Sequence, residues 1–283
     1  MSKVAVVTDT ISCIPANLIK EYDIRIIPIG LVIDRKEYKD TDLTNEQFWD
    51  LFYKTKEPIT TNAANPADFE SIFSDLARTT DSIVCIPVSR LLSATCNMAD
   101  QAKTVVQARI PSLKIEIIDS KSATGAQGFI VLEAARAAAA GQSLAEVTRI
   151  AQELVPRIKF FSSLSTLKYL RRCGRAPKSA FLGDWLQVKP ILGMINGSGL
   201  VENLGRERGM DKAIEKMLDL AAGIIDPSRP LHVMAHYSDD ITIGEKIRDF
   251  MTSRYQCSEA YLTPYTAVMS SQTGPVVAVA FYQ

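Results

Sequence analysis

Val4-Ala5-Val6-Val7-Thr8-Asp9-Thr10 opens the chain with an apolar run that ends in short polar residues. Apolar runs of strand length recur at 24–32, 83–87 and 115–118, with helical stretches between several of them. The runs VAVV and IEII do not alternate polar with apolar residues, which is typical of strands in a parallel sheet covered on both faces. The first half is therefore expected to be an α/β domain built on a doubly wound, mainly parallel sheet flanked by helices.

A second α/β region is expected from about residue 158, where an apolar stretch leads into a helix that ends at Gly174. The pattern that follows comprises strands at 190–195, 231–235 and 276–281, helices around 211–223 and 243–255, and a turn at 196–199. We place the boundary beside Pro156. This gives an N-terminal domain of residues 1–156 and a C-terminal domain of residues 157–283.

The composition is that of a folded protein with no net charge. Of 283 residues, 47% are hydrophobic and 23% are charged, far from the composition of a disordered chain. Lys plus Arg and Asp plus Glu both number 32, so no overall positive field exists to attract a polyanion. Nucleic acid is therefore not expected as a partner.

A cytoplasmic location is expected. The first strand-like run begins too soon after Met1 to leave room for a signal peptide. The stretch 128–141 is broken by Glu133 and Arg136 and is too short to cross about 30 Å of hydrocarbon. The five cysteines form no Cys-x-x-Cys pair and are interpreted as reduced thiols.

Common catalytic motifs are missing from the sequence. It has no GxxxxGK[ST] loop, no GxSxG elbow, no HExxH and no convincing GxGxxG. The two histidines, His232 and His236, lie across one expected strand and its end, where a structural role is the common one. No catalytic residue, cofactor or metal site is therefore assigned.

Polar residues end several of the expected strands, and they define a candidate site beyond the carboxyl ends of the sheet. They are Thr8, Asp9, Thr10, Ser89, Asp119 and Ser120. Each could instead cap the helix that follows it. An alternative function is open here, a small-molecule enzyme in which Asp9 and Asp119 bind a metal or act as acid and base. Nothing in the sequence adds a third metal ligand.

Two further segments suit an anion. Ser89 to Thr95 follows an apolar strand and opens a helix, so Ser93 and Thr95 lie where backbone N–H groups are unpaired. Thr60 to Pro66 forms a polar loop before another helix, and its hydroxyls could supply more donors. Alternatively, Ser93 is a helix cap, and Thr60 and Thr61 only solvate the loop.

These segments, taken in order along the chain, resemble the DegV family. The matching motifs are Thr8-Asp9-Thr10 with Pro15, a TSQPS-like loop at 61–65, an SxxLSGT-like segment at 89–95, Asp119-Ser120 with a glycine-rich turn at 125–128, an LxYLxxGGR-like segment at 167–175, a KPIL strand at 189–192 and a THTGPG-like segment at 271–276. The matches span residues 4 to 282. A DegV-like two-domain fold is therefore expected.

The resemblance implies a lipid-binding protein rather than an enzyme in its own right. In that family the carboxylate of a long-chain fatty acid is held by positions that correspond to Thr61 and Ser93, and the acyl chain enters a tunnel between the domains. A separate fatty acid kinase then forms the acyl phosphate, and transient membrane contact is expected. Thr95, Gln272 and Thr273 are candidates near the head group. A structural or regulatory module with an empty pocket stays open as a third function.

Three departures from the family pattern leave the head-group geometry open. Ala94 stands where the family has glycine, Gln272 replaces a histidine, and Cys173 replaces one glycine of the GGR triplet. Acyl chain length, saturation and oligomeric state stay open as well.

The densest basic run, Lys168 to Lys178, either complements the negative end of a helix or meets an acidic partner or a phosphate. Within it we assign partner docking to Arg172 and Arg175.

Overall fold

The computed structural model describes residues 4–62, 64–177 and 188–283. A four-stranded sheet of order β2-β1-β6-β7 forms the centre of the N-terminal part, and its neighbouring strands are all parallel. Its strands are β1 (Ala5–Asp9), β2 (Arg25–Ile27), β6 (Ser82–Cys85) and β7 (Lys114–Ile117). The parallel sheet expected from the sequence is confirmed.

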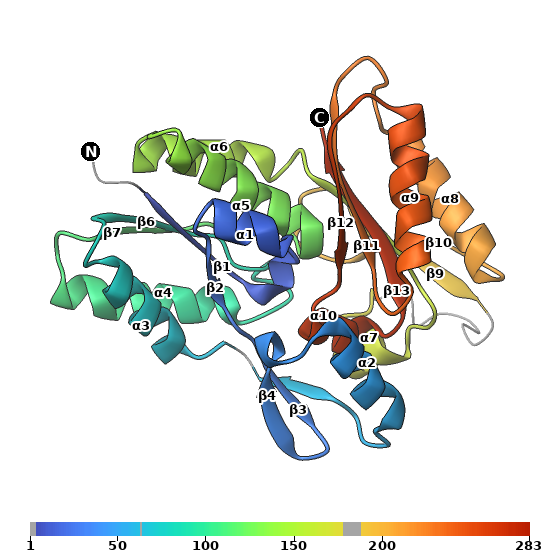
Figure 1. The fold of residues 1–283 in the computed structure, drawn as a ribbon, viewed down its shortest axis with the longest axis horizontal. Helices are drawn as coiled ribbons and strands as arrows, with labels where there is room; N and C mark the ends of the chain where they lie inside the picture. Colours follow the sequence, from blue (N-terminus) through green and yellow to red (C-terminus); the bar gives the residue numbers. More distant parts are fainter. Residues whose placement is uncertain (1–3, 63, 178–187) are drawn as a thin grey trace.

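Helices cover both faces of this sheet (Figure 1). The helices α3 (Pro66–Leu76) and α4 (Thr95–Arg109) lie on one face, and α5 (Thr124–Ala139) and α6 (Leu144–Leu154) lie on the other. The short helices η1 (Thr10–Ser12) and α1 (Ala16–Glu21) follow β1. Strands enclosed in this way need apolar side chains on both sides, which accounts for the run VAVV.

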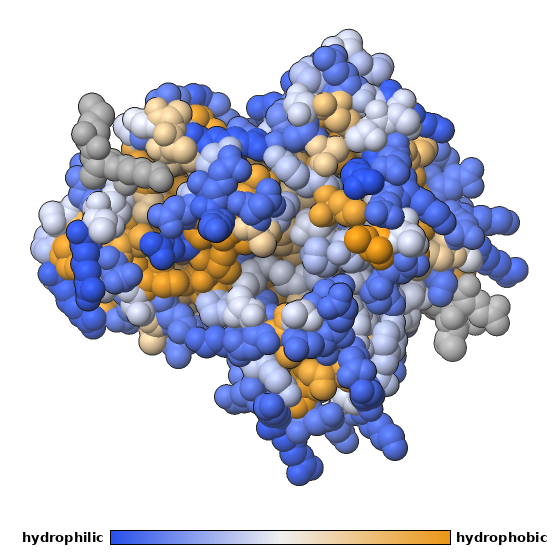
Figure 2. Space-filling view, in the orientation of Figure 1, coloured by the Kyte–Doolittle hydropathy of each residue, from blue (hydrophilic) through white to orange (hydrophobic). Residues whose placement is uncertain are grey.

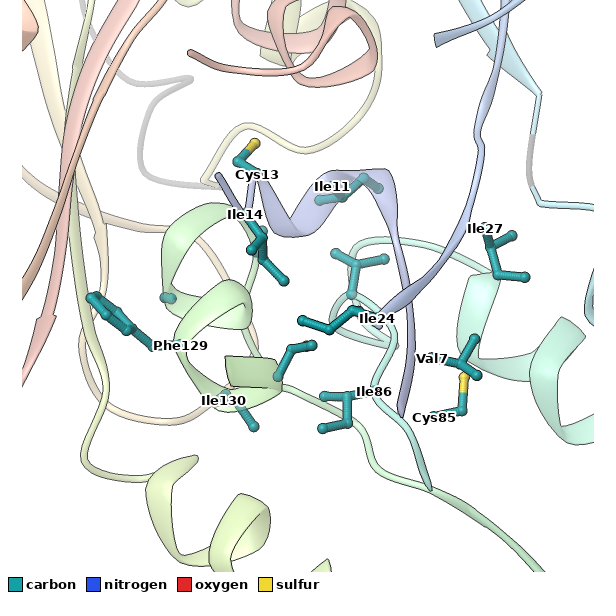
Figure 3. Packing of buried hydrophobic residues seen from close by; sticks show 14 of the residues in the cluster. Val7, Ile11, Cys13, Ile14, Ile24, Ile27, Cys85, Ile86, Phe129 and Ile130 are labelled. Carbon is teal, nitrogen blue, oxygen red and sulfur yellow. The ribbon is translucent and has the colours of Figure 1, made fainter. Parts of the chain in front are cut away.

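The core of the N-terminal part is continuous with the contact to the second sheet. Val7, Ile27 and Cys85, from three neighbouring strands, are fully buried on the face of the sheet away from α5, and Ile86 lies on the other face beside Ile130 of α5 (Figure 3). Phe129 of α5 points the other way, and its ring meets that of Tyr282 edge-on at 5.2 Å between centroids. Each fully buried side chain of this size contributes about 1.5–3 kcal/mol to folding. Helix α5 therefore packs against both sheets.

The run at 24–32 does not form a single strand, which corrects the expectation. It divides at Pro28 into β2 and β3 (Gly30–Ile33), and β3 belongs to a separate antiparallel sheet of order β4-β3-β5. At the division the Asp40 carboxylate accepts a hydrogen bond from the Ile29 N–H at 3.1 Å, and the Asp40 N–H donates to the Ile29 carbonyl at 2.9 Å. Asp40 therefore provides hydrogen-bond partners for the Ile29 N–H and carbonyl at the point where the chain leaves the parallel sheet.

The small sheet contains a second correction. Residues 60–62 were expected in a loop but form β5, which pairs with β3 so that Thr61 lies opposite Leu31. The remaining elements here are β4 (Lys36–Lys39), η2 (Asp40–Asp42) and α2 (Asn45–Lys54). Thr61 is consequently held on a strand rather than on a free loop.

A six-stranded sheet of order β10-β9-β8-β13-β11-β12 forms the C-terminal part, and all its pairs are antiparallel except β11 with β12. The strands are β8 (Lys159–Leu164), β9 (Lys189–Met194), β10 (Glu202–Glu207), β11 (Leu231–Tyr237), β12 (Cys257–Pro264) and β13 (Val276–Tyr282). The helices are α7 (Lys168–Arg172), α8 (Met210–Ala222), α9 (Ile241–Arg254) and α10 (Ala267–Thr273). The expected α/β character of this part is confirmed. The division at residue 156 stays a prediction.

Side chains of this sheet alternate between two environments, as the strand period of two requires. Phe161 of β8 packs with Met217 of α8 in the cluster on one face. Its neighbours Phe160, Ser162 and Leu164 face the N-terminal part. The alternation thus supplies a row of side chains to the space between the two sheets.

Gly125 and Gly128 lie in the first turns of α5 and not in a turn after the strand, which corrects a third expectation. A Cβ at Gly125 would lie 2.3 Å from the His236 Nε2, and one at Gly128 would lie 2.6 Å from the Ser12 carbonyl oxygen. Both glycines therefore allow α5 to approach neighbouring segments closely.

On the face shown in Figure 2, hydrophobic surface appears in patches separated by polar side chains. Within the described ranges, no helix combines the length and apolar character needed to cross a membrane.

Candidate functional site

A cavity of about 320 Å³ lies between the two sheets. This volume falls at the lower end of the range typical of small-molecule sites. Most of its wall is apolar, with contributions from η1, α7, α10, β8 and β9 and from the segment before α4. The apolar side chains include Ile11, Val88, Phe160, Leu164, Leu192, Met194, Val268 and Met269.

Four of the polar residues selected from the sequence line this cavity. They are Thr61, Ser93, Gln272 and Thr273, and Arg175, selected for partner docking, joins them. Thr61 comes from β5, Ser93 from the turn before α4, and Gln272 and Thr273 from the end of α10. The fold therefore brings together residues from three distant segments of the chain around one apolar space.

Thr61, Gln272 and Arg175 form a chain of hydrogen bonds. The Gln272 Nε2 donates to the Thr61 Oγ1 at 3.2 Å, and the Arg175 Nη1 donates to the Gln272 Oε1 at 2.8 Å. The Arg175 Nε also donates to the Leu92 carbonyl at 2.8 Å, next to Ser93. Arg175 is thus linked by hydrogen bonds to both segments with candidate head-group hydroxyls: directly to the turn that contains Ser93, and through Gln272 to Thr61.

Ser93 contacts Thr95 in the turn before α4. Their hydroxyl oxygens are 2.8 Å apart, and the Thr95 N–H donates to the Ser93 Oγ at 3.3 Å. The helix begins after Ala94, whose side chain has no acceptor for the first-turn N–H groups. Thr95 itself is buried and is not among the described residues that line the cavity. It therefore contacts the Ser93 hydroxyl without facing the cavity.

Thr273 lies on the cavity wall, but its hydroxyl has nearby backbone acceptors. The Thr273 Oγ1 is 3.0 Å from both the Met269 and the Gly274 carbonyl oxygens. Its single hydroxyl hydrogen is therefore directed to the backbone.

The structure separates Arg172 from Arg175. Arg172 is exposed, donates to the Ile59 carbonyl at 3.1 Å and lies 5.5 Å from the centre of the Tyr169 ring. It is not among the described residues that line the cavity, whereas Arg175 is. Lys178, the end of the basic run, lies outside the described residues.

The strand-end aspartates are engaged by backbone groups. The two oxygens of Asp9 accept hydrogen bonds from the N–H groups of Ile11 and Val88, and burial raises its pKa to about 6. Asp119 accepts from the N–H groups of Arg90 and Lys121. Among the residues with described positions, no group of three or more potential metal ligands is found. Asp9 therefore caps the short helix η1, as the alternative expected, whereas Asp119 does not cap the helix that follows it, because α5 begins after Ala123.

The two histidines have contacts typical of structural residues. His232 contacts Glu259 at 2.8 Å and stacks on the ring of Tyr282. His236 is fully buried beside α5, and burial lowers its pKa to about 3.

Tyr265, Thr124 and Ser162 line the cavity but were missed in the sequence. Tyr265 lies in the segment between β12 and α10, and Thr124 begins α5. The period-two alternation of β8 could have assigned Ser162. Tyr265 and Thr124 carry no comparable signal, because they lie at the ends of elements, where no periodic pattern applies.

The fold and the site together define a two-domain α/β protein with an apolar cavity between its sheets and a cluster of hydrogen-bonding side chains on the cavity wall. A family model described as "Uncharacterised protein, DegV family" matches residues 3–283. A DegV domain-containing protein of Caldanaerobacter subterraneus subsp. tengcongensis is 38% identical over 221 residues, which cover 77% of this chain and 76% of the relative. The chain belongs to the DegV family, so the resemblance is confirmed.

Solved structures agree with this assignment. A DegV family protein from Thermus thermophilus, described as binding a fatty acid, has a TM-score of 0.90 at 26% identity and covers 100% of both chains. A stearic acid-binding protein from Eubacterium ventriosum has a TM-score of 0.89 at 22% identity, covering 100% of this chain and 98% of the other. The second likeness concerns the fold alone.

Proposed function

We propose that this chain is a cytoplasmic carrier that encloses one long-chain fatty acid in the cavity between its sheets. The observation that carries the proposal is that Thr61 and Ser93, chosen from the sequence for a carboxylate, line the same apolar cavity. The described fatty-acid binding of the Thermus thermophilus relative supports it.

The acyl chain supplies the binding energy. Burying roughly fourteen methylenes at ~0.8 kcal/mol each gives on the order of 11 kcal/mol, from which the entropy lost on association is subtracted. The wall residues of β8 and β9 provide the apolar surroundings that this term requires.

The carboxylate is the costly end, because a buried charge without partners costs several kcal/mol. The hydroxyls of Thr61 and Ser93 offset that cost, since a hydrogen bond to a charged acceptor contributes roughly 1.5–3 kcal/mol. The guanidinium of Arg175 on the same wall adds an opposite charge. The two hydroxyls and the guanidinium thus suit the carboxylate of a fatty acid, and the apolar wall suits its acyl chain.

A separate kinase completes the proposed role by phosphorylating the carboxylate. The family resemblance supports this step, and Arg172 is exposed for docking. Transient contact with a membrane would supply or remove the fatty acid.

Calorimetric titration of delipidated protein tests the binding step. We expect saturation at one long-chain fatty acid per chain. The matched control is the methyl ester of the same acid, which keeps the acyl chain but removes the charge and should bind more weakly. Equal affinity for acid and ester would argue against a carboxylate site.

A further inference from the structure

We infer that the chain contains a second binding site, a mostly apolar cavity with one buried carboxylate, which accepts a small organic amine in its protonated form. The cavity has a volume of about 350 Å³ and is lined by residues from η1 to α1, from η2 to α2 and from the end of β12 to the start of α10. Among the described residues, Tyr265 alone lines both this cavity and the one between the sheets. The inference therefore does not depend on the proposed function.

The Asp40 carboxylate has an oxygen without a partner in this wall. Its Oδ1 accepts a hydrogen bond from the Ile29 N–H at 3.1 Å, but its Oδ2 has no hydrogen-bond partner among the described residues. Asp40 is only 5% exposed, and burial raises its pKa to about 7. A buried carboxylate oxygen is costly to leave unpaired, so this wall favours a ligand that donates hydrogen bonds and carries positive charge.

Two hydroxyls on the same wall also have no partner among the described residues. They belong to Thr10, which is buried beside Asp40, and to Thr266. Other polar side chains of the wall are engaged, since Ser12 and Asn45 donate to backbone carbonyls at 2.8 and 2.9 Å. The carboxylate oxygen and both hydroxyl oxygens can accept, and an ammonium group offers only donors. The unpartnered groups thus match a protonated amine.

The rest of the cavity suits the apolar body of such an amine. Its wall contains several aliphatic side chains, which are those of Ile14, Ile19, Ile26 and Leu43. Thr41 and Thr44 line the cavity and are exposed, so the cavity opens to the surface on their side. Methylenes next to the ammonium group would leave water on binding, which stabilises the complex. An amine with a short alkyl chain uses both parts of the wall.

A methyl NMR titration with pentan-1-amine tests the inference. The protein is first loaded with fatty acid, and the pH is 8.5, where the Asp40 carboxylate is ionised and the amine, like a lysine side chain, is charged. Saturable shifts are expected for the methyl groups of Ile14, Ile19 and Ile26, but not for Leu164 and Leu192 of the other cavity. The positions of the shifts identify the occupied cavity even if the protein carries no fatty acid.

Two charge variants and an uncharged ligand separate the carboxylate from the rest of the cavity. Asp40→Asn keeps an oxygen for the Ile29 N–H but removes the charge, so it should weaken amine binding on the order of tenfold to a hundredfold. The affinity for pentan-1-ol should change by less than about twofold. Glu46→Gln is the matched control, because Glu46 is exposed beside Asn45 and is not on the described wall. It should leave amine binding within about twofold.

Equal amine affinities of the wild type and Asp40→Asn would overturn the second site, and so would the absence of saturable shifts at the three isoleucines. Equal losses in both charge variants would also overturn it, because the amine would then respond only to the general field. If Asp40→Asn does not fold, Ala16→Leu decides, since Ala16 is an exposed wall residue and a larger side chain there narrows the cavity. Ala16→Leu should weaken amine binding at least about fivefold, and unchanged binding would overturn the inference. A protein that binds the amine but no fatty acid would overturn the proposed function alone.

Discussion

His236 of β11 accepts a hydrogen bond from the backbone N–H of Gly125, in the first turn of α5, at 3.0 Å. The contact joins the C-terminal sheet to the helix that also packs on β1. An imidazole nitrogen that accepts must be unprotonated. Burial enforces this state, since it lowers the pKa of His236 to about 3.

Acid should therefore destabilise the protein through His236. In the unfolded chain this residue binds a proton below its ordinary pKa near 6.5, whereas the folded chain resists protonation until about 3. The stabilising contribution is present above pH 6.5 and is lost as the pH falls toward 3. Between pH 7 and pH 4 the loss should reach about 3 kcal/mol of unfolding free energy.

Asp9 and Asp40 have the opposite effect on the pH dependence of the unfolding free energy, because burial raises their pKa values to about 6 and about 7. Comparing the wild-type protein with His236→Gln, which keeps an acceptor for the Gly125 N–H, removes the contributions of the two aspartates. Denaturant unfolding of both proteins should show a difference that changes by about 3 kcal/mol between pH 7 and pH 4. Parallel curves for the two proteins would mean that His236 titrates as an ordinary histidine.

The close contact between Gly125 and His236 predicts that a methyl group added at Gly125 lowers the stability of the folded protein. In Gly125→Ala the Cβ would lie 2.3 Å from the His236 Nε2 and 2.8 Å from the Met234 Sδ. Overpacking of this kind costs about 1–3 kcal/mol, which should exceed the gain in helix propensity of about 1 kcal/mol. Gly223→Ala is the matched control, because its Cβ would meet no atom closer than 3.6 Å. Equal melting temperatures for the two variants would refute the packing argument.

The head-group assignment predicts that Thr61→Ala combined with Ser93→Ala weakens fatty-acid binding by roughly 2–5 kcal/mol while the fold stays intact. Both hydroxyls are expected to donate to the carboxylate. Thr60→Ala is the control on the same strand, because Thr60 is exposed and is not on the described cavity wall. Unchanged affinity in a folded double variant would place the carboxylate elsewhere.

Arg172 and Arg175 should behave differently, although the sequence assigned both to partner docking. Arg175→Ala should weaken fatty-acid binding by roughly 1.5–3 kcal/mol, because it removes a charge from the cavity wall and the donor to Gln272. Arg172→Ala should change that affinity by less than about 1 kcal/mol. It should slow acyl-phosphate formation with the cognate kinase, most clearly at low salt. Equal effects of the two substitutions on lipid binding would show that Arg172 also shapes the cavity.

The parallel sheet was predictable because VAVV and IEII carry its signature directly. The small antiparallel sheet was not, because its strands are short and β5 consists of the polar residues Thr60 to Asn62. Its pairing depends on β3, which the sequence alone merges with β2 across Pro28. Pro28 is a local sign of a break in the run, but the Asp40 carboxylate that accepts the Ile29 N–H there comes from a separate segment of the chain.

The candidate site could also be predicted only in part from the sequence. The residue types at Thr61 and Ser93 suggested an anion, and the structure brings both to one cavity. The hydrogen bonds that link Arg175, Gln272 and Thr61 join β5 to residues more than a hundred positions away. Such links depend on how the two sheets pack, so residue spacing could not supply them.

Mass spectrometry of an organic extract of the purified protein tests the carrier function most directly. A long-chain fatty acid is expected at about one molecule per chain. Much less of this lipid is expected in the extract of the folded Thr61→Ala, Ser93→Ala double variant. An extract without fatty acid, together with failure of the protein to take one up on addition, would contradict the carrier function.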